Sequence, residues 1–164
     1  MCRRLFCCGA WKRFDFMGKA EQAAKERRVF LEFLNLNSWP NDVLLFESRN
    51  PPEPDILYNH PTEGEIAFEL TELCAEEIAS ALPYVGSEAR FIRASSPVES
   101  IISQKIGKHY KTEHPKELLC YTAGRTVEPD DMILAEIRHA VKESSCQFRK
   151  IWLLGDSLHL VHSI

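Results

Sequence analysis

Two acidic residues stand on neighbouring predicted strands, where they could share one divalent cation. Asp55 follows Pro54 in a short apolar run, 54–58, and Glu69 lies in the middle of an alternating run, 64–73. The turn formers between the runs predict two joined strands. A carboxylate within an apolar strand is costly to bury alone, and Mg²⁺ takes oxygen ligands, including one or two carboxylates. The alternative is a surface hairpin whose Glu69 faces water.

A third acidic candidate lies on a helix predicted over 20–35. The apolar face of this helix has a 3.6-residue spacing and comprises Ala23, Phe30, Phe33 and Leu34. At 100° per residue, Glu26 falls inside that face and Glu32 on the opposite side. An acid on the buried face either serves a site or pairs locally with Arg27 or Arg28.

A lysine points toward the same region from a second predicted helix, 96 to about 111. The start Ser96-Pro97-Val98-Glu99 combines a serine cap, a proline and a glutamate in the positions that favour a helix. Lys105 falls on the apolar face and Lys108 at its edge, so Lys105 must either snorkel or meet an anion. The functional interpretation is that it reaches the strand carboxylates. His109, on the same arc, is typical of a satisfied core histidine.

The stretch around this helix carries the densest positive charge of the globular part. The cations are Lys105, Lys108, Lys111 and Lys116, accompanied by His109 and His114. They form either a solvated basic face or a phosphate-contacting patch. In the second case Lys108, Lys111 and Lys116 are the candidate nucleic-acid contacts.

Composition limits the classes of partner. The chain has 164 residues, 45% hydrophobic and 27% charged, enough for one domain with a real core. Its net charge of −4 means that any nucleic-acid contact must come from a local patch. No apolar run approaches a membrane span, so no membrane partner is expected.

Cysteine use favours a reducing compartment. Cys74, Cys120 and Cys146 stand singly within apolar or helical patterns, as reduced cysteines of a cytoplasmic protein do. Residues 1–19 are basic and predict a flexible tail ahead of a single domain over 20–164. A lipidated Cys7-Cys8 pair, or a partial metal site, is an alternative role for the tail.

The order of the remaining elements indicates the fold class. Strands are predicted over 43–47, 117–123, 149–154 and 158–161. Helices are predicted over 74–82 and from a cap at Asp130 to about 144. A loop over 84–95 could cover the site. Continuous apolarity over 118–121 favours a central strand covered on both sides. The sequence therefore predicts a three-layer α/β domain, with a central mixed sheet flanked by helices.

The motif and the strand order together resemble the restriction-endonuclease-like PD-(D/E)XK nuclease superfamily. Pro54-Asp55 and then Glu69-Leu70-Thr71 match the motif, and the resemblance covers about 20–161. It implies a metal-dependent nuclease that hydrolyses phosphodiester bonds, with Mg²⁺ or Mn²⁺ held by Asp55, Glu69 and the Leu70 carbonyl. It also implies a catalytic acid from the first helix, a role that Glu26 matches.

One position departs from the family pattern. Thr71 stands where the superfamily has a lysine, and threonine cannot supply positive charge to the attacking hydroxide or the phosphate. Some members carry this cation on the next helix, and by helical geometry Lys105 could replace it there.

Two other functions remain open. The first is a catalytically inactive, nuclease-like binding or regulatory module; the second is a small immunity or regulatory protein without a nucleic-acid role, which the acidic composition favours. No Gly-x-Ser-x-Gly elbow, Gly-x-Gly-x-x-Gly or P-loop occurs. The expected partner is nucleic acid, DNA before RNA, with a homodimer as one option for the assembly.

Overall fold

The computed structural model describes residues 10–73, 97–122 and 128–164. The elements in chain order are α1 (Ala10–Leu36), the 3₁₀ turn η1 (Val43–Leu45), β1 (Phe46–Ser48), β2 (Ile56–His60), β3 (Gly64–Glu72), α3 (Pro97–Gly107), β4 (Lys116–Tyr121), α4 (Asp130–Lys142), β5 (Lys150–Leu154) and β6 (Leu158–Ser163). The predicted helix over 74–82 and loop over 84–95 lie outside the described residues.

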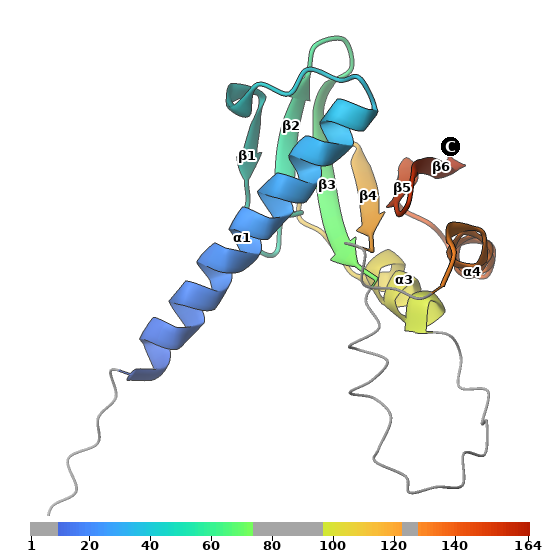
Figure 1. Ribbon diagram of the computed structural model, residues 1–164, viewed down its shortest axis with the longest axis horizontal. Coiled ribbons are helices and arrows are strands. Elements are labelled where there is room, and N and C mark those ends of the chain that lie inside the picture. The colour runs from blue at the N-terminus through green and yellow to red at the C-terminus, as the bar shows by residue number, and fades with distance from the viewer. Residues whose placement is uncertain (1–9, 74–96, 123–127) are drawn as a thin grey trace, which may run out of the picture.

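The strands form one six-stranded mixed sheet in the order β1-β2-β3-β4-β5-β6. The β3–β4 and β4–β5 pairs are parallel, and the other pairs are antiparallel. Parallel neighbours need a crossover connection, and α4 lies between β4 and β5 in the chain, as α3 lies between β3 and β4. The parallel strands therefore form the centre of the sheet, with antiparallel strands at both edges (Figure 1).

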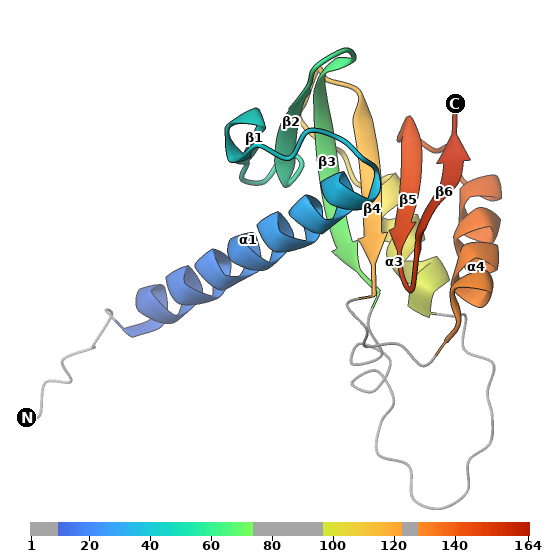
Figure 2. The ribbon, with the colours of Figure 1, turned by 45° about the horizontal axis from the view of Figure 1, so that its top comes forward.

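Helices cover both faces of this sheet (Figure 2). On one face, Phe30 and Phe33 of α1 pack on β3, with the Phe30 ring 4.9 Å from that of Phe68. On the other face, Ile102 of α3 and Ile137 of α4 belong to a second core with β4 and β5. Burying each side chain of this size contributes about 1.5–3 kcal/mol to the stability of the fold. The predicted α/β class and mixed sheet flanked by helices are confirmed.

The alternation of β3 decides which side chains face which helix layer. Ile66, Phe68 and Leu70 lie in the core under α1, so Glu69 and Thr71, one residue out of phase, face α3. Both faces of the strand are buried, and all residues from 66 to 71 are less than 9% exposed. The predicted orientation of Glu69 toward the second helix is therefore correct.

Several element boundaries differ from the prediction. Helix α1 begins at Ala10 rather than 20, and its first part extends away from the sheet (Figures 1 and 2). The segment 10–19 contains no proline, and its one glycine costs a helix only about 1 kcal/mol. The predicted strand over 43–47 starts later, at Phe46, because Asp42 caps a 3₁₀ turn first.

Two predictions about the helices were wrong. Helix α3 ends at Gly107, not near 111, so His109 leaves the apolar arc and is exposed rather than a core residue. Asp130 does not cap α4; Pro129 occupies the N-cap position. The Asp130 carboxylate instead accepts hydrogen bonds from the backbone N–H groups of Asp156 and Ser157 in the β5–β6 turn.

Among the described helices, none combines the length and the apolarity needed to cross a lipid bilayer.

Candidate active site

The site is built on β3 and the residue that precedes β2. Ile56 lies opposite Phe68 in the antiparallel β2–β3 register. Extending that register by one residue along each chain sets Asp55 beside Glu69. The backbone N–H of Leu70 donates to Asp55 Oδ2 at 2.8 Å. This bond fixes the carboxylate just before the start of β2 and does not use its second oxygen, Oδ1.

The two oxygens of the buried Glu69 carboxylate have different hydrogen-bond environments. Its side chain is only 1% exposed, and Oε1 accepts from Lys105 Nζ at 2.7 Å and from Lys108 Nζ at 3.1 Å. Oε2 is buried and has no hydrogen-bond partner among the described residues. Burying a carboxylate oxygen without a partner is costly, so this atom is a candidate ligand atom.

The cation predicted on the second helix is present at the carboxylates. Lys105 lies in the last turn of α3, and its Nζ also lies 3.5 Å from the Leu70 carbonyl oxygen. Its side chain is 25% exposed, against 42% for Lys108. Thr71, in the family's lysine position, is buried on the same face of β3 and carries no charge.

Two acidic residues near the site, Asp55 and Glu26, have raised pKa values. Burial, with the Glu69 charge as the second cause, raises the pKa of Asp55 to about 7. Burial also raises the pKa of Glu26, again with a contribution from the Glu69 charge, while a hydrogen bond from Gln22 opposes the rise. Glu26 therefore lies within electrostatic reach of Glu69, and among the described residues its hydrogen bond comes from Gln22 rather than from Arg27 or Arg28; its role in a site stays a prediction. Raised carboxyl pKa values gathered in one region are typical of functional sites.

Tyr110 is a site residue that the sequence did not reveal. It is 2% exposed, its hydroxyl donates to the Lys105 carbonyl at 3.4 Å, and Lys108 Nζ lies 4.7 Å from its ring centre. Burial and the nearby Glu69 charge raise the pKa of its hydroxyl far above the usual range. Tyr110 thus contacts the Lys105 backbone through its hydroxyl and the Lys108 ammonium group through its ring. No periodic pattern marks it, because it follows the end of α3.

The predicted nucleic-acid contacts have separate environments. Lys108 belongs to the Glu69 cluster, whereas Lys111 is exposed at the surface. Lys116 donates to Gln147 Oε1 at 2.7 Å, which ties the start of β4 to the segment before β5. Lys108 and Lys111 therefore keep the exposure expected of a phosphate contact, whereas Lys116 is partly buried.

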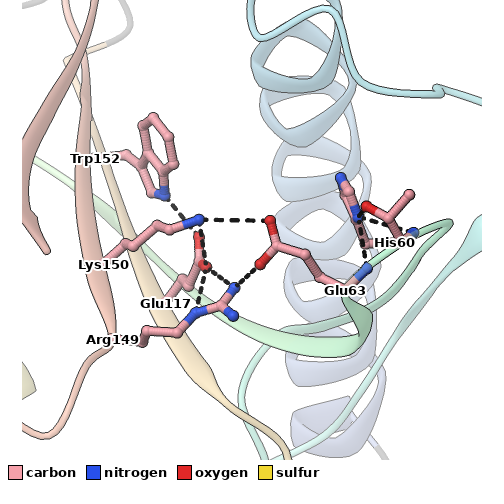
Figure 3. Close-up of polar contacts among 7 residues, drawn as sticks. His60, Glu63, Glu117, Arg149, Lys150 and Trp152 are labelled. Carbon is pink, nitrogen blue, oxygen red and sulfur yellow. Dashed lines mark hydrogen bonds and ion pairs between the residues drawn. The ribbon is translucent and has the colours of Figure 1, made fainter. Parts of the chain in front are cut away.

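A second buried carboxylate provides a contrast with Glu69. Glu117 lies on the α1 face of the sheet, where its Oε1 accepts from Arg149 and its Oε2 from Trp152 Nε1 at 2.7 Å (Figure 3). Glu63, from the β2–β3 turn, accepts from the same arginine at 2.7 Å and lies 3.7 Å from Lys150. Both Glu117 oxygens are thus partnered, which makes this cluster a structural network.

A serine, a histidine and an aspartate also meet near the β5–β6 turn. Ser157 Oγ and Asp130 Oδ2 lie 2.8 Å and 3.0 Å from the same His159 nitrogen, Nε2. A catalytic triad needs the nucleophile and the acid on different ring nitrogens. This group therefore holds the turn, and it does not form a hydrolase site.

Within the described part of the chain, no three or more histidine, cysteine, aspartate or glutamate side chains are arranged to hold a metal ion. The candidate donors at β2 and β3 are two carboxylates and one carbonyl. Comparisons with known protein families, with curated proteins and with solved structures found no match to this chain.

Proposed function

We propose that this protein is a metal-dependent nuclease whose active site is formed by Asp55, Glu69 and Lys105. The observation that carries the proposal is Glu69, a buried carboxylate with one oxygen on two lysines and the other without a partner among the described residues. The fully partnered Glu117 shows how this chain satisfies a carboxylate that serves structure alone. The PD-(D/E)XK-like spacing adds to this support.

The donors at the site fit Mg²⁺ or Mn²⁺. Glu69 Oε2, the Asp55 oxygen not used by Leu70 and the Leu70 carbonyl are hard oxygen atoms, and Mg²⁺ usually takes one or two carboxylates and completes its shell with water. When bound, such an ion acidifies water and offsets charge on a phosphate. Burial and the neighbouring Glu69 charge raise the pKa of Asp55, and a cation between the two carboxylates would reduce their repulsion.

The chain's own residues supply the remaining functions. The Leu70 N–H group orients Asp55, and Lys105 places an ammonium group where charge develops on the phosphate oxygens. Glu26 would hold a water or an outer ligand from the helix side. Lys105 thereby takes the role that Thr71 cannot fill.

The test is cleavage of single-stranded and double-stranded DNA and RNA with Mg²⁺ or Mn²⁺, by the wild type and by Asp55→Asn and Glu69→Gln. Each variant keeps the side-chain shape and removes one anionic ligand, so we expect turnover to fall at least about 10²-fold. Circular dichroism and thermal melting check that both variants stay folded.

Asp131→Asn is the matched control, since Asp131 is an exposed aspartate on α4 whose Oδ1 accepts only the adjacent Met132 N–H in the described part of the chain. It should cleave like the wild type. Wild-type turnover by either site variant would contradict the proposal.

A nuclease-like binding module without catalysis is the second candidate. The observation that favours it is the double ion pair, because two lysines already compensate Glu69 without a metal. Nucleic-acid binding by a wild type that cleaves none of the four substrates would select this function.

A further inference from the structure

A pocket of about 240 Å³ lies beside the carboxylates on the same face of the sheet. Its floor includes Leu57 and Ala67, which are opposite one another in the β2–β3 register. The same register, two residues further along, leads to Asp55 and Glu69. Two residues of strand span about 6.6 Å, so the pocket adjoins the proposed active site.

The floor and the walls of this pocket differ in polarity. Pro54, Leu57 and Ala67 are buried and present apolar surface. The walls are polar: Arg49 lies on one side, and the segment 111–114, which precedes β4, lies on the other. An apolar floor between polar walls suits a flat ring with hydrogen-bonding edges.

The charges of the walls are nearly balanced. Arg49 pairs with Glu47 at 2.6 Å and with Glu53 at 3.6 Å, and His114 lies 3.6 Å from Glu65. Lys111 and Glu113, two residues apart in the chain, add one charge of each sign to the lining. A phosphate site carries excess positive charge, whereas this lining offers both donors and acceptors to a neutral group.

One wall donor is unused. Arg49 Nε is buried and has no hydrogen-bond partner among the described residues. A guanidinium group can stack on the face of a base as well as donate to its edge. The backbone N–H of Arg49 is already bonded to the Asp55 carbonyl oxygen at 2.8 Å, which joins this wall to the carboxylate site.

We propose that this pocket binds the base of a nucleotide next to the scissile phosphate, and that the substrate is therefore single-stranded or unpaired at that nucleotide. The inference rests on the proposed nuclease function and specifies its substrate. A base within a duplex is stacked and paired, so it must leave the stack before it can reach a pocket in the face of a protein sheet.

The first test scans the substrate and keeps the protein intact. Single-stranded pentanucleotides, each with one abasic position, are titrated in EDTA by fluorescence anisotropy, so that binding is measured without cleavage. We expect one position to weaken affinity about tenfold, the order of one stacked base, and the others to change it little. Equal affinity for all five oligonucleotides and the unmodified one would overturn the inference.

The second test fills the pocket. Ala67→Leu projects three more carbons over the floor and should abolish the position-specific abasic effect, while Ala135→Leu, on an exposed position of α4, should preserve it. Should Ala67→Leu fail to fold, the wild-type scan still decides the question.

Measuring cleavage beside binding distinguishes a failure of the base pocket from a failure of the proposed nuclease function. A protein that cleaves paired duplex as fast as single strands, with no abasic effect, retains the nuclease function and loses the pocket. A protein that shows the abasic effect but cleaves nothing retains the pocket and loses the nuclease.

Discussion

Lys105 and Lys108 donate to the same oxygen of Glu69, yet their surroundings differ. Lys105 is the more buried of the two and also approaches the Leu70 carbonyl, whereas Lys108 lies beyond the end of α3 over the Tyr110 ring. A fixed, partly desolvated cation stabilises developing charge better than a mobile one. Under the proposed nuclease function we therefore expect Lys105 to act in catalysis and Lys108 in affinity.

Lys105→Met should lower turnover about 10²-fold or more, because one preorganised stabilising group is lost. The methionine keeps most of the packing of the stem, and Lys108 still pairs with Glu69, so the melting temperature should shift by only a few degrees, on the order of 1 kcal/mol. Single-turnover cleavage and thermal melting measure the two effects.

Lys108→Met is the matched comparison on the same carboxylate. It should weaken nucleic-acid binding and flatten its dependence on salt, since one phosphate contact is removed. Normal cleavage by Lys105→Met together with inactivity of Lys108→Met would exchange the two roles, and normal cleavage by both would exclude a lysine on this helix as the catalytic cation.

At the scale of the elements, the β5–β6 turn depends on one glycine. A methyl group at Gly155 would overlap with the Asp130 carboxylate, which also accepts the Asp156 and Ser157 N–H groups and contacts His159. These bonds lower the pKa of Asp130, although burial opposes them. The turn and the start of α4 are therefore held by one side chain.

Gly155→Ala should destabilise the fold by about 1–3 kcal/mol, because the Asp130 carboxylate must give up its bonds. Gly107→Ala is the control, since a methyl group there meets no atom of the described residues within 4 Å beyond its chain neighbours and its own helix backbone. Urea unfolding of both variants measures the cost. Equal stability of the two would show that the carboxylate moves freely.

The Glu117 network joins three elements on the α1 face of the sheet. Arg149, just before β5, bonds to Glu117 at the start of β4 and to Glu63 in the β2–β3 turn (Figure 3). Glu117 is completely buried. Removing one partner of a buried pair leaves an uncompensated charge, which costs more than the pair itself contributes.

Arg149→Met should lower the free energy of unfolding by about 3 kcal/mol, the low end for a broken buried pair, since Lys150 and Trp152 still contact Glu117. The double variant Arg149→Met/Glu117→Leu should recover part of the loss. Arg138→Met, at an exposed position on α4, serves as the control. A double variant less stable than the single one would contradict this account.

At the scale of the whole molecule, the raised pKa of Asp55 should make the folding stability depend on pH. Asp55 has a folded pKa of about 7 against an ordinary value of 3.8. Its protonated form is favoured in the folded chain, so the unfolded chain binds fewer protons between these values. The contribution of Asp55 to stability is therefore present below about pH 3.8 and is lost as the pH rises to about 7.

In EDTA, the wild type should consequently lose stability relative to Asp55→Asn as the pH rises from 4 to 8. The asparagine variant lacks this titration, and the difference between the two proteins cancels the other groups. Thermal melting across the range measures it. Parallel pH profiles would show that Asp55 keeps an ordinary pKa.

Several parts of the fold follow from local patterns. The period of two in Ile66, Phe68 and Leu70 sets Glu69 on the opposite face, and the helical phase of 98–106 directs Lys105 toward it. These predictions succeeded because side-chain direction within a strand or a helix is fixed by backbone geometry. The end of α3 at Gly107 and the early start of α1 were missed, because helix ends depend on weak local preferences.

The sequence by itself therefore determined the layered α/β fold, the faces of its central strands and the carboxylates with their helix cation. Only the tertiary structure decided that Lys108 pairs with Glu69, that Tyr110 lies near the Glu69 charge, and that Glu117 is neutralised by Arg149, 32 residues away. The physical reason is that each of these contacts joins segments distant in the chain. Their partners are selected by packing and by the cost of buried charge, and neither leaves a periodic pattern in the sequence.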